Sequence, residues 1–295
     1  MHADHNNIFR AALWMTGAIV SFSAMAVAGR ELAGALDTFE IMMYRSVIGL
    51  VIVCLFLTFT GHWHRVSAAR FGTHMLRNLV HFIGQNLWFL AVTLIPLAQV
   101  FALEFTSPLW VIVLAPFFLG ERLTKIRAIA AGMGFIGILI VARPSPETLS
   151  IGMLAAAASA VFFASTTILT KRLTRTDSIG CIMFWLTCLQ ALMGLGMAGF
   201  DGDIALPGAQ GAPLVGLIAI GGLMAHYCYA NALAIAPATV VVPIDFTRLP
   251  VIALVGMLYY DEALDGFVLL GALIIFGGNY LNVRHETRKN RVARE

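Results

Sequence analysis

The stretch "VFALEFTSPL", residues 100–109, places a carboxylate, Glu104, inside an otherwise apolar run. A second stretch, "VVPIDFTRLP" at residues 241–250, repeats the order acid, Phe, Thr with Asp245 as the acid. The two acidic residues lie 141 positions apart, and the same offset relates further identical pairs: Phe22 and Phe163, Pro96 and Pro237, Glu121 and Glu262, Gly137 and Gly278. The chain is therefore interpreted as two copies of one unit.

The composition excludes an ordinary soluble domain. Of the 295 residues, 59% are hydrophobic and 12% are charged, and the mean hydropathy is +0.85. Soluble domains average about 45–50% apolar and about 25% charged residues. Apolar surface left in water costs free energy in proportion to its area, so most of this chain must face lipid. The net charge of +3 requires no nucleic-acid partner.

Apolar segments of suitable length recur along the whole chain. A helix needs about 20 apolar residues to cross a bilayer, and the short alternating segments of a membrane β-barrel are absent from the sequence. Residues 11–28 could pass for a cleavable signal peptide, but the repeat requires them as its first helix. We predict ten spans, at residues 8–28, 38–60, 76–94, 97–119, 125–142, 150–170, 178–199, 213–234, 237–259 and 264–284.

Lys and Arg are distributed unevenly between the segments that connect these spans. If the N-terminus is cytoplasmic, the outer loops carry only Arg30 and Arg143. The inner segments then carry Arg10, Arg65, Arg70, Arg77, Arg122, Lys125, Arg127, Lys171, Arg172, Arg175, Arg284, Arg288, Lys289, Arg291 and Arg294. Cytoplasmic loops are enriched in positive charge, which predicts that both termini are cytoplasmic.

The loop charges also indicate that the two copies have opposite orientations. An odd number of helices per copy makes the second copy enter the membrane from the other side. Accordingly, basic "ERLTKIR" at 121–127 corresponds to acidic "DEALD" at 261–265, and sparsely charged "GRELAGALD" at 29–37 corresponds to basic "TKRLTRTDS" at 170–178. Inverted repeats of this kind build transporters whose substrate site lies near the midplane between the halves.

The fold class that follows is an all-α integral membrane protein with ten transmembrane helices as two inverted five-helix repeats. We expect residues 1–145 to form the first repeat, with a cytoplasmic N-terminus. Residues 146–295 are expected to form the second, inverted repeat with a basic cytoplasmic tail.

Two stretches of the first repeat, "LEFTSPLWVIVLAPFFLGERLT" at 103–124 and "GFIGILIVARP" at 134–144, resemble the drug/metabolite transporter superfamily, EamA type. That family has a Pro in the fourth helix, a Glu just after it, and a glycine-bearing fifth helix that ends in a basic residue and Pro. The matching residues are Pro108, Glu121, Gly134, Gly137, Arg143 and Pro144, with looser matches at Glu262, Gly277 and Gly278. Pro250 lies one place later than the offset predicts.

The resemblance implies a secondary transporter with a central cavity and no fixed catalytic motif. The superfamily includes bacterial exporters of amino acids, and we expect this chain to be similar to the YddG-type exporters. The resemblance thus implies export of aromatic and other neutral amino acids by alternating access across a bacterial inner (plasma) membrane. An importer or exchanger of S-adenosylmethionine, drugs or another metabolite is the alternative. A membrane enzyme or a scaffold is a minority alternative, because no nucleophile–base pair, His-Glu-x-x-His or phosphate loop is present. We expect a small-molecule substrate, no cofactor, and a monomer or homodimer in the lipid bilayer.

Polar residues of the third span are the first candidates for a substrate site. In "RNLVHFIGQNLWFLAV", residues 77–92, His81, Gln85 and Trp88 share one helix face. At the 141-residue offset, Gln85 corresponds to His226 and Trp88 to Tyr229. Polar side chains at membrane depth are costly and usually face a cavity or a partner helix. We therefore assign these residues to substrate binding, with helix–helix hydrogen bonding as the alternative.

Other aromatic and polar residues of the spans divide between binding and packing. Phe101 is a candidate wall of the cavity, and Tyr44 and Trp185 form another offset pair with the same assignment. The residues that fall off the polar-aromatic face are expected to pack between helices: Asn78, Asn86, Tyr227 and Asn231.

Four charged residues lie within the spans. Arg45 and Glu104 are at equal depth, which predicts an ion pair between them, and Asp245 and Arg248 can pair at i, i+3. The alternative is that one carboxylate carries a coupling proton. We favour the structural ion pair, because an unpaired charge at this depth is expensive.

The remaining assignments concern backbone shape and sulfur chemistry. Pro108, Pro243 and Pro250 interrupt the fourth and ninth spans and are predicted to act as hinges. Glycines of the fifth and tenth spans are predicted to be packing or dimerisation elements: Gly132, Gly134, Gly137, Gly271, Gly277 and Gly278. The four cysteines predict no disulfide, and no metal site is expected at His62 and His64.

Overall fold

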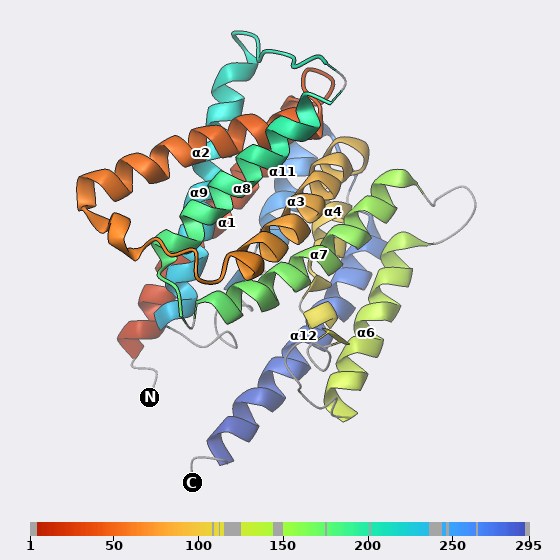
Figure 1. Cartoon of the computed structure of the whole chain (residues 1–295). Helices are drawn as coiled ribbons and strands as arrows, with labels where there is room; N and C mark the ends of the chain where they lie inside the picture. The colour runs from red at the N-terminus through yellow and green to blue at the C-terminus, as the bar shows by residue number, and fades with distance from the viewer. Residues whose placement is uncertain are drawn as a thin grey trace.

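The protein is helical throughout the residues that the computed structural model describes, which confirms the all-α prediction (Figure 1). Beyond helices and turns, those residues hold one isolated bridge, between Ala33 and Leu36. The described residues are 5–107, 109–111, 113–114, 125–143, 150–174, 176–200, 202–235, 244–245, 248–263 and 265–292.

Each described α-helix overlaps one predicted span, although the helices in the fourth and ninth spans cover only part of those spans. In the first half the helices are α1 (His5–Glu31), α2 (Thr38–Thr60), the short 3₁₀ helix η1 (His62–Arg65), α3 (Phe71–Leu94), α4 (Leu97–Glu104) and α6 (Lys125–Ala142). In the second half they are α7 (Ile151–Leu173), α8 (Ile179–Ala198), α9 (Gly211–Ile235), α11 (Arg248–Tyr260) and α12 (Gly266–Val292).

Local sequence explains where several helices begin and end. Asp37 and Glu40 form a reciprocal capping box at the start of α2, which satisfies two backbone N–H groups. Ser150 caps α7, and Ser178 caps α8. Pro96 is the N-cap of α4, as expected for a residue without an N–H.

Five of the described helices are long and apolar enough to cross a membrane by length and composition: α1, α2, α7, α8 and α9. α6, α11 and α12 contain shorter apolar segments. α3 is long enough but carries a stripe of buried polar residues, which lowers its mean hydropathy. Its polar face is instead covered by helices α7 and α8.

The acid-Phe-Thr motif of the first repeat marks a break in the fourth helix. The sequence predicts a continuous span at 97–119, but α4 ends at Glu104 and residues 105–106 form a turn. The hydroxyl of Thr106 donates to the carbonyl of Leu103 across this turn, at 2.7 Å. Broken helices are typical of transporters, where the free helix ends line the substrate path.

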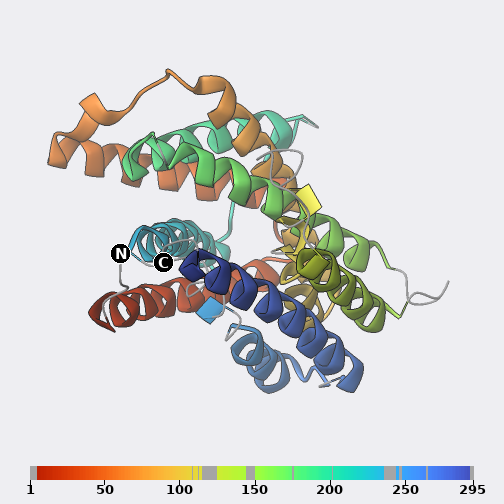
Figure 2. The same ribbon diagram turned by 90° about the horizontal axis from the view of Figure 1, so that it is seen from below.

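The two halves of the chain are interleaved (Figures 1 and 2). α1 packs along α9 and α3 packs along α7, two contacts that a two-fold axis would exchange. α2 packs along α8, and α6 packs along α12. Each of these latter pairs joins equivalent helices of the two repeats, so both pairs lie on the pseudo-two-fold axis.

Loops that the charge pattern assigns to one side of the membrane lie together. Among the predicted outer segments, Arg30 forms an ion pair with Glu262. Among the predicted inner segments, Arg70 lies 3.6 Å from Asp177. The first turn of α1 and the last turns of α12 lie at the same end of the bundle (Figure 1). Which end faces the cytoplasm stays a prediction of the charge pattern.

Candidate functional site

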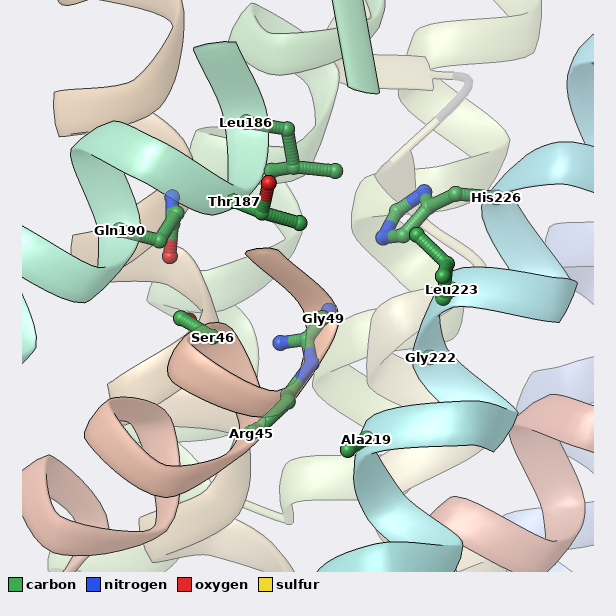
Figure 3. A pocket seen from close by; sticks show the side chains of 10 residues that line it. All are labelled: Arg45, Ser46, Gly49, Leu186, Thr187, Gln190, Ala219, Gly222, Leu223 and His226. Carbon is green, nitrogen blue, oxygen red and sulfur yellow. The ribbon is translucent and has the colours of Figure 1, made fainter. Parts of the chain in front are cut away.

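A small pocket lies between α2, α8 and α9 (Figure 3). Its volume is about 20 Å³, which is room for one water molecule. We call it the central pocket, and its lining residues are Arg45, Ser46, Gly49, Leu186, Thr187, Gln190, Ala219, Gly222, Leu223 and His226.

The central pocket lies where the two repeats meet. Three pairs of its lining residues are separated by the repeat offset of 141 positions: Arg45 and Leu186, Ser46 and Thr187, Gly49 and Gln190. These pairs come from α2 and α8, the equivalent helices that pack on the pseudo-two-fold axis. Inverted-repeat transporters place their substrate site at this position.

Arg45 brings a positive charge into the pocket. Only 7% of this residue is exposed, and its guanidinium lies between α2 and α9 (Figure 3). A Cβ added at Gly222 would lie 2.7 Å from Nε of Arg45, so the glycine provides the space that the guanidinium occupies.

The predicted ion pair between Arg45 and Glu104 is wrong. Arg45 forms no ion pair with any carboxylate of the described residues. Its nearest polar contact is with the sulfur of Met42, 3.4 Å from Nη1. Equal depth did not make the two groups meet, because α4 packs against α7 and α11 and not against α2.

Polar groups without partners lie in and beside the central pocket. The rings of His81 and His226 meet edge to face, with centroids 5.2 Å apart. Neither nitrogen of His81, nor Nε2 of His226, has a hydrogen-bond partner. The amide nitrogen of Gln190 donates to the carbonyl of Asn78 at 3.0 Å, while its oxygen is buried without a partner. Buried polar groups are almost always paired, so unpaired ones at a pocket indicate a missing ligand or water.

Arg77 is a second buried cation near the pocket, although the charge pattern assigns it to an inner loop. Only 2% of Arg77 is exposed. Its Nε donates to the hydroxyl of Thr170, and its Nη1 donates to the side chain of Asn78. These partners are neutral, so the positive charge of Arg77 adds to that of Arg45. The spacing of Arg77 and His81 at i, i+4 could have identified it.

A separate charged cluster links α4 to α11. Arg248 donates to Glu104 at 2.8 Å and to Asp245 at 3.2 Å, the second contact having the predicted i, i+3 spacing. The indole N–H of Trp88 donates to the other oxygen of Glu104 at 2.7 Å. The Arg248 guanidinium also lies within about 5 Å of three aromatic rings, those of Phe22, Phe101 and Phe105. One arginine thus holds two carboxylates beside an aromatic wall.

The remaining predicted binding residues lie in different parts of the structure and do not form one site with the central pocket. Trp88 and Phe101 are buried in the charged cluster and do not line the central pocket. Gln85 is buried on the same α3 face as His81. Tyr229 packs with residues of α1.

Tyr44 and Trp185 each precede a lining residue, Arg45 and Leu186, but do not line the central pocket themselves. The hydroxyl of Tyr44 donates to the carbonyl of Ala205 at 2.9 Å. The indole of Trp185 donates to the carbonyl of Ser67 at 2.9 Å. Each side chain therefore holds a loop in place through a hydrogen bond to its backbone. This structural role does not support the assignment of the two residues to substrate binding.

Two of the three predicted hinge prolines, Pro108 and Pro243, lie outside the described residues. Pro250 is the third residue of α11, a first-turn position where a missing N–H costs little. Asn78, Asn86 and Asn231 each donate to a carbonyl four residues earlier, as expected for packing residues.

Gln190 and Thr187 are site residues that the sequence reasoning missed. Both are polar residues inside the apolar α8 span. Their depth in the membrane was the available signal, and Gln190 also stands at the repeat offset from Gly49.

Comparison with known proteins matches the chain to one family along both repeats. The model of the EamA-like transporter family matches residues 9–143 and again residues 150–284. These two matches are displaced by the same 141 positions as the acid-Phe-Thr motifs.

Several curated bacterial transporters are similar over most of their length. A riboflavin transporter of Vibrio cholerae is 30% identical over 290 residues, which cover 96% of each chain. An S-adenosylmethionine uptake transporter of Rickettsia conorii is 25% identical over 89% of this chain and 88% of its own. A pseudopaline exporter of Pseudomonas aeruginosa is 25% identical over 86% of this chain and 89% of its own. A solved crystal structure shares the fold, with a TM-score of 0.66 and 20% identity over 94% of this chain and 98% of its own.

Proposed function

The chain belongs to the EamA-like transporter family and is a multi-pass membrane transporter, and on this premise we propose that it carries riboflavin or a similar heteroaromatic metabolite. The observation that carries the proposal is the central pocket, where unpaired donors and acceptors meet on the pseudo-two-fold axis. The full-length similarity to a riboflavin transporter supports this choice of substrate. The bacterial source of the relatives supports the predicted placement in an inner membrane.

The chemistry of the pocket suits one edge of a flavin ring. That edge presents carbonyl oxygens and ring nitrogens that accept hydrogen bonds, on either side of one imide N–H. Arg45 and His226 line the pocket and offer donors, and His81 lies beside it with its ring against that of His226. The free oxygen of Gln190 offers an acceptor for the imide. The ring of Phe22 lies edge to face against His226, with centroids 5.6 Å apart, and offers apolar surface beside these groups. A few polar groups that fix orientation beside apolar surface are typical of small-molecule sites.

S-adenosylmethionine is the second candidate. Four uptake transporters from Rickettsia species, each 24–25% identical over 89% of this chain, support it. Its sulfonium group is a cation, however, and the two buried arginines of this region, Arg45 and Arg77, have no carboxylate partner among the described residues. Like charges repel strongly where water is excluded. We therefore rank it behind riboflavin.

The amino-acid export that the resemblance to YddG-type exporters implies has less support. None of the relatives named here is an amino-acid exporter. A carboxylate would nevertheless pair well with Arg45. Amino acids therefore belong in the substrate panel, with transport in either direction measured.

Transport would require the helices around the pocket to separate. A volume of about 20 Å³ holds one water, whereas pockets for drug-sized ligands measure about 300–1,000 Å³. We propose that α2 and α8 move relative to α9, which would open the central pocket to one side of the membrane at a time. The near symmetry of the interleaved repeats provides two similar, oppositely facing arrangements.

The test is uptake of labelled riboflavin by bacteria that lack riboflavin synthesis and their own carrier. Expression of this chain should restore uptake and growth on low riboflavin. Arg45→Ala and Gln190→Ala should each reduce uptake by about 10- to 100-fold, because a hydrogen bond to a charged or buried group contributes about 1.5–3 kcal/mol. Arg45→Lys should retain part of the activity, since lysine keeps the positive charge but lacks the planar guanidinium with its several N–H donors.

Asn231→Ala is the matched control. This half-buried amide lies on α9 like His226, but it does not line the central pocket, and its nitrogen donates to the carbonyl of Tyr227 in its own helix. It should transport as the wild type does, at equal abundance in the membrane. Flux of amino acids without flux of riboflavin would overturn the proposal and restore the amino-acid interpretation. Equal losses of riboflavin uptake in Asn231→Ala and Gln190→Ala would also contradict the assignment of the central pocket as the substrate site.

A further inference from the structure

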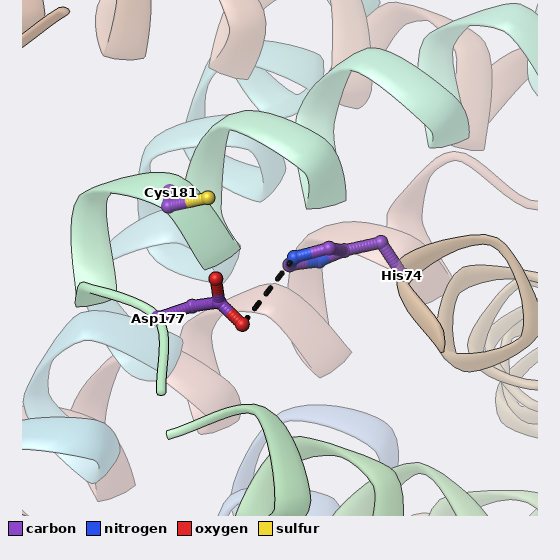
Figure 4. A group of neighbouring side chains, drawn as sticks. All are labelled: His74, Asp177 and Cys181. Atoms are coloured by element: carbon purple, nitrogen blue, oxygen red, sulfur yellow. Dashed lines mark ion pairs between the residues drawn. The ribbon is translucent and has the colours of Figure 1, made fainter. Parts of the chain in front are cut away.

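Three metal-binding side chains converge at the end of the bundle that the charge pattern places in the cytoplasm (Figure 4). His74 belongs to the first turn of α3, Cys181 to the first turn of α8, and Asp177 to the turn before α8. Their ligand atoms all lie within 4.8 Å of one another. Nε2 of His74 is 3.9 Å from Oδ2 of Asp177. We call these three residues the His74 cluster.

His74 is an unexplained buried polar group. None of its surface is exposed, and neither ring nitrogen has a hydrogen-bond partner. The Trp185 ring lies beside it, with centroids 6.0 Å apart, and offers no acceptor. An imidazole buried in this way loses its hydration without compensation, which points to an ion or water that belongs at the site.

The donor set of the cluster suits a borderline metal ion. One imidazole, one thiolate and one carboxylate are ligands that Zn²⁺ takes, at about 2.0–2.3 Å in tetrahedral geometry. Those bond lengths place ligand atoms about 3.3–3.7 Å apart, so the ligand atoms need to approach one another by up to about 1.5 Å. The carbonyl oxygen of Ser67, 3.5 Å from the sulfur of Cys181, or a water could complete the tetrahedron.

The surrounding charges allow a dication to bind. A thiolate and a carboxylate together balance two positive charges. Arg70 lies 3.6 Å from the Asp177 oxygen that faces His74, but 46% of its side chain is exposed. An exposed ion pair contributes little, and Arg70 can therefore turn into solvent. The same Asp177 oxygen also accepts a hydrogen bond from the hydroxyl of Thr176 at 3.1 Å, and a carboxylate oxygen has enough lone pairs to keep that bond and bind a metal. Arg77 is held by Thr170 and Asn78, and its charge lowers the affinity without blocking the site.

We propose that His74, Asp177 and Cys181 bind a divalent transition-metal ion of the Zn²⁺ class. His74 belongs to the first repeat, and the other two ligands belong to the second. The metal would therefore join the two repeats at one end of the bundle and hold that end closed. This effect on transport, unlike the binding itself, rests on the proposed function.

Cobalt is the probe for binding, because a thiolate bound to Co²⁺ gives a charge-transfer absorption in the near ultraviolet. The purified full chain should show this band with one Co²⁺ per protein, and Zn²⁺ should displace it. Cys181→Ser should abolish the band, and His74→Gln and Asp177→Asn should weaken cobalt binding by about tenfold or more. Cys188→Ser changes another cysteine of α8 outside the cluster and should leave the band unchanged.

Two further variants separate this site from weaker ones. His62→Ala with His64→Ala removes the exposed histidine pair of η1 and should not affect the band. Arg70→Gln should tighten cobalt binding several-fold, because it removes the competing cation from Asp177. That surface variant keeps the test decisive even if a change at a buried ligand prevents folding. An unchanged affinity in Arg70→Gln would contradict the assignment of Asp177 as a ligand.

The absence of a thiolate band in the wild type, or its persistence in Cys181→Ser, would overturn the proposal. If the metal joins the repeats, Zn²⁺ should raise the melting temperature of the wild type and not of Cys181→Ser. Zn²⁺ should also slow riboflavin flux in the wild type alone. The absorption band does not depend on any substrate, so failure of the proposed transport function and failure of the metal site remain distinguishable.

Discussion

At the scale of single residues, the two carboxylates that the repeat duplicates share one arginine. Arg248 contacts both Glu104 and Asp245, and Trp88 adds a hydrogen bond to Glu104. A buried charge is tolerated when it is paired and hydrogen-bonded. The motif therefore serves to hold α4 and α11 together across the repeat interface, which favours a structural role over a proton relay.

We expect Glu104→Gln to retain folding and transport. The amide keeps the shape of the side chain, and Arg248 keeps its second carboxylate, Asp245. Riboflavin flux in proteoliposomes, measured with and without a pH gradient, checks this. Loss of the pH dependence with intact folding would identify Glu104 as a proton carrier.

Arg248→Met should behave differently, because it leaves Glu104 and Asp245 buried without their shared cation. Removing one partner of a buried ion pair costs about 3–5 kcal/mol. We expect a lower melting temperature in detergent and less protein in the membrane. If Arg248→Met were as stable as Glu104→Gln, the cluster would not be structural.

At the scale of helices, α6 and α12 approach each other through their glycines. A Cβ at Gly137 would lie 2.9 Å from the carbonyl oxygen of Gly271, and a Cβ at Gly278 would lie 2.8 Å from that of Ala130. Small residues allow helix backbones to approach closely in a membrane. Of the two predicted roles, packing and dimerisation, these contacts support packing between two helices of one chain.

Gly137→Ala should lower the melting temperature, and Gly132→Ala on the same helix is its control. Alanine favours helix over glycine by about 1 kcal/mol at both positions. At Gly132 the added Cβ meets nothing within 4 Å, whereas at Gly137 it would lie 2.5 Å from Cγ1 of Ile275. Overpacking costs about 1–3 kcal/mol. In detergent, the melting temperature should therefore fall in Gly137→Ala and rise in Gly132→Ala. Equal shifts of the melting temperature in the two variants would contradict a tight contact between α6 and α12.

At the scale of the whole molecule, the repeats interleave. α1 packs with α9 and α3 with α7, so neither repeat buries its own helices alone. The central pocket and the His74 cluster both depend on this arrangement, because each takes side chains from both halves. Neither site can form in an isolated repeat.

The two ends of α7 should be accessible from opposite sides of the membrane. In a cysteine-free background, Ile151→Cys should react with impermeant maleimide added outside, and Thr174→Cys only after the membrane is opened. Both positions are exposed, and the cap at Ser150 is retained. The reverse pattern would invert the orientation predicted from Lys and Arg.

The sequence alone determined the fold class, the approximate positions of most spans and the repeat, because lipid requires long apolar segments and duplication leaves matching residues at a constant offset. It did not show that the fourth span breaks after Glu104. It also singled out Arg45, His81 and His226, since polar groups at membrane depth are rare. The tertiary structure alone decided which residues of different helices become partners, whereas the Asp245–Arg248 contact follows from its i, i+3 spacing. Glu104 pairs with Arg248 and not with Arg45, and Gln190 and Arg77 join the site region. The sequence does not show these contacts, because they depend on which helices pack together and not on the separation of the residues along the chain.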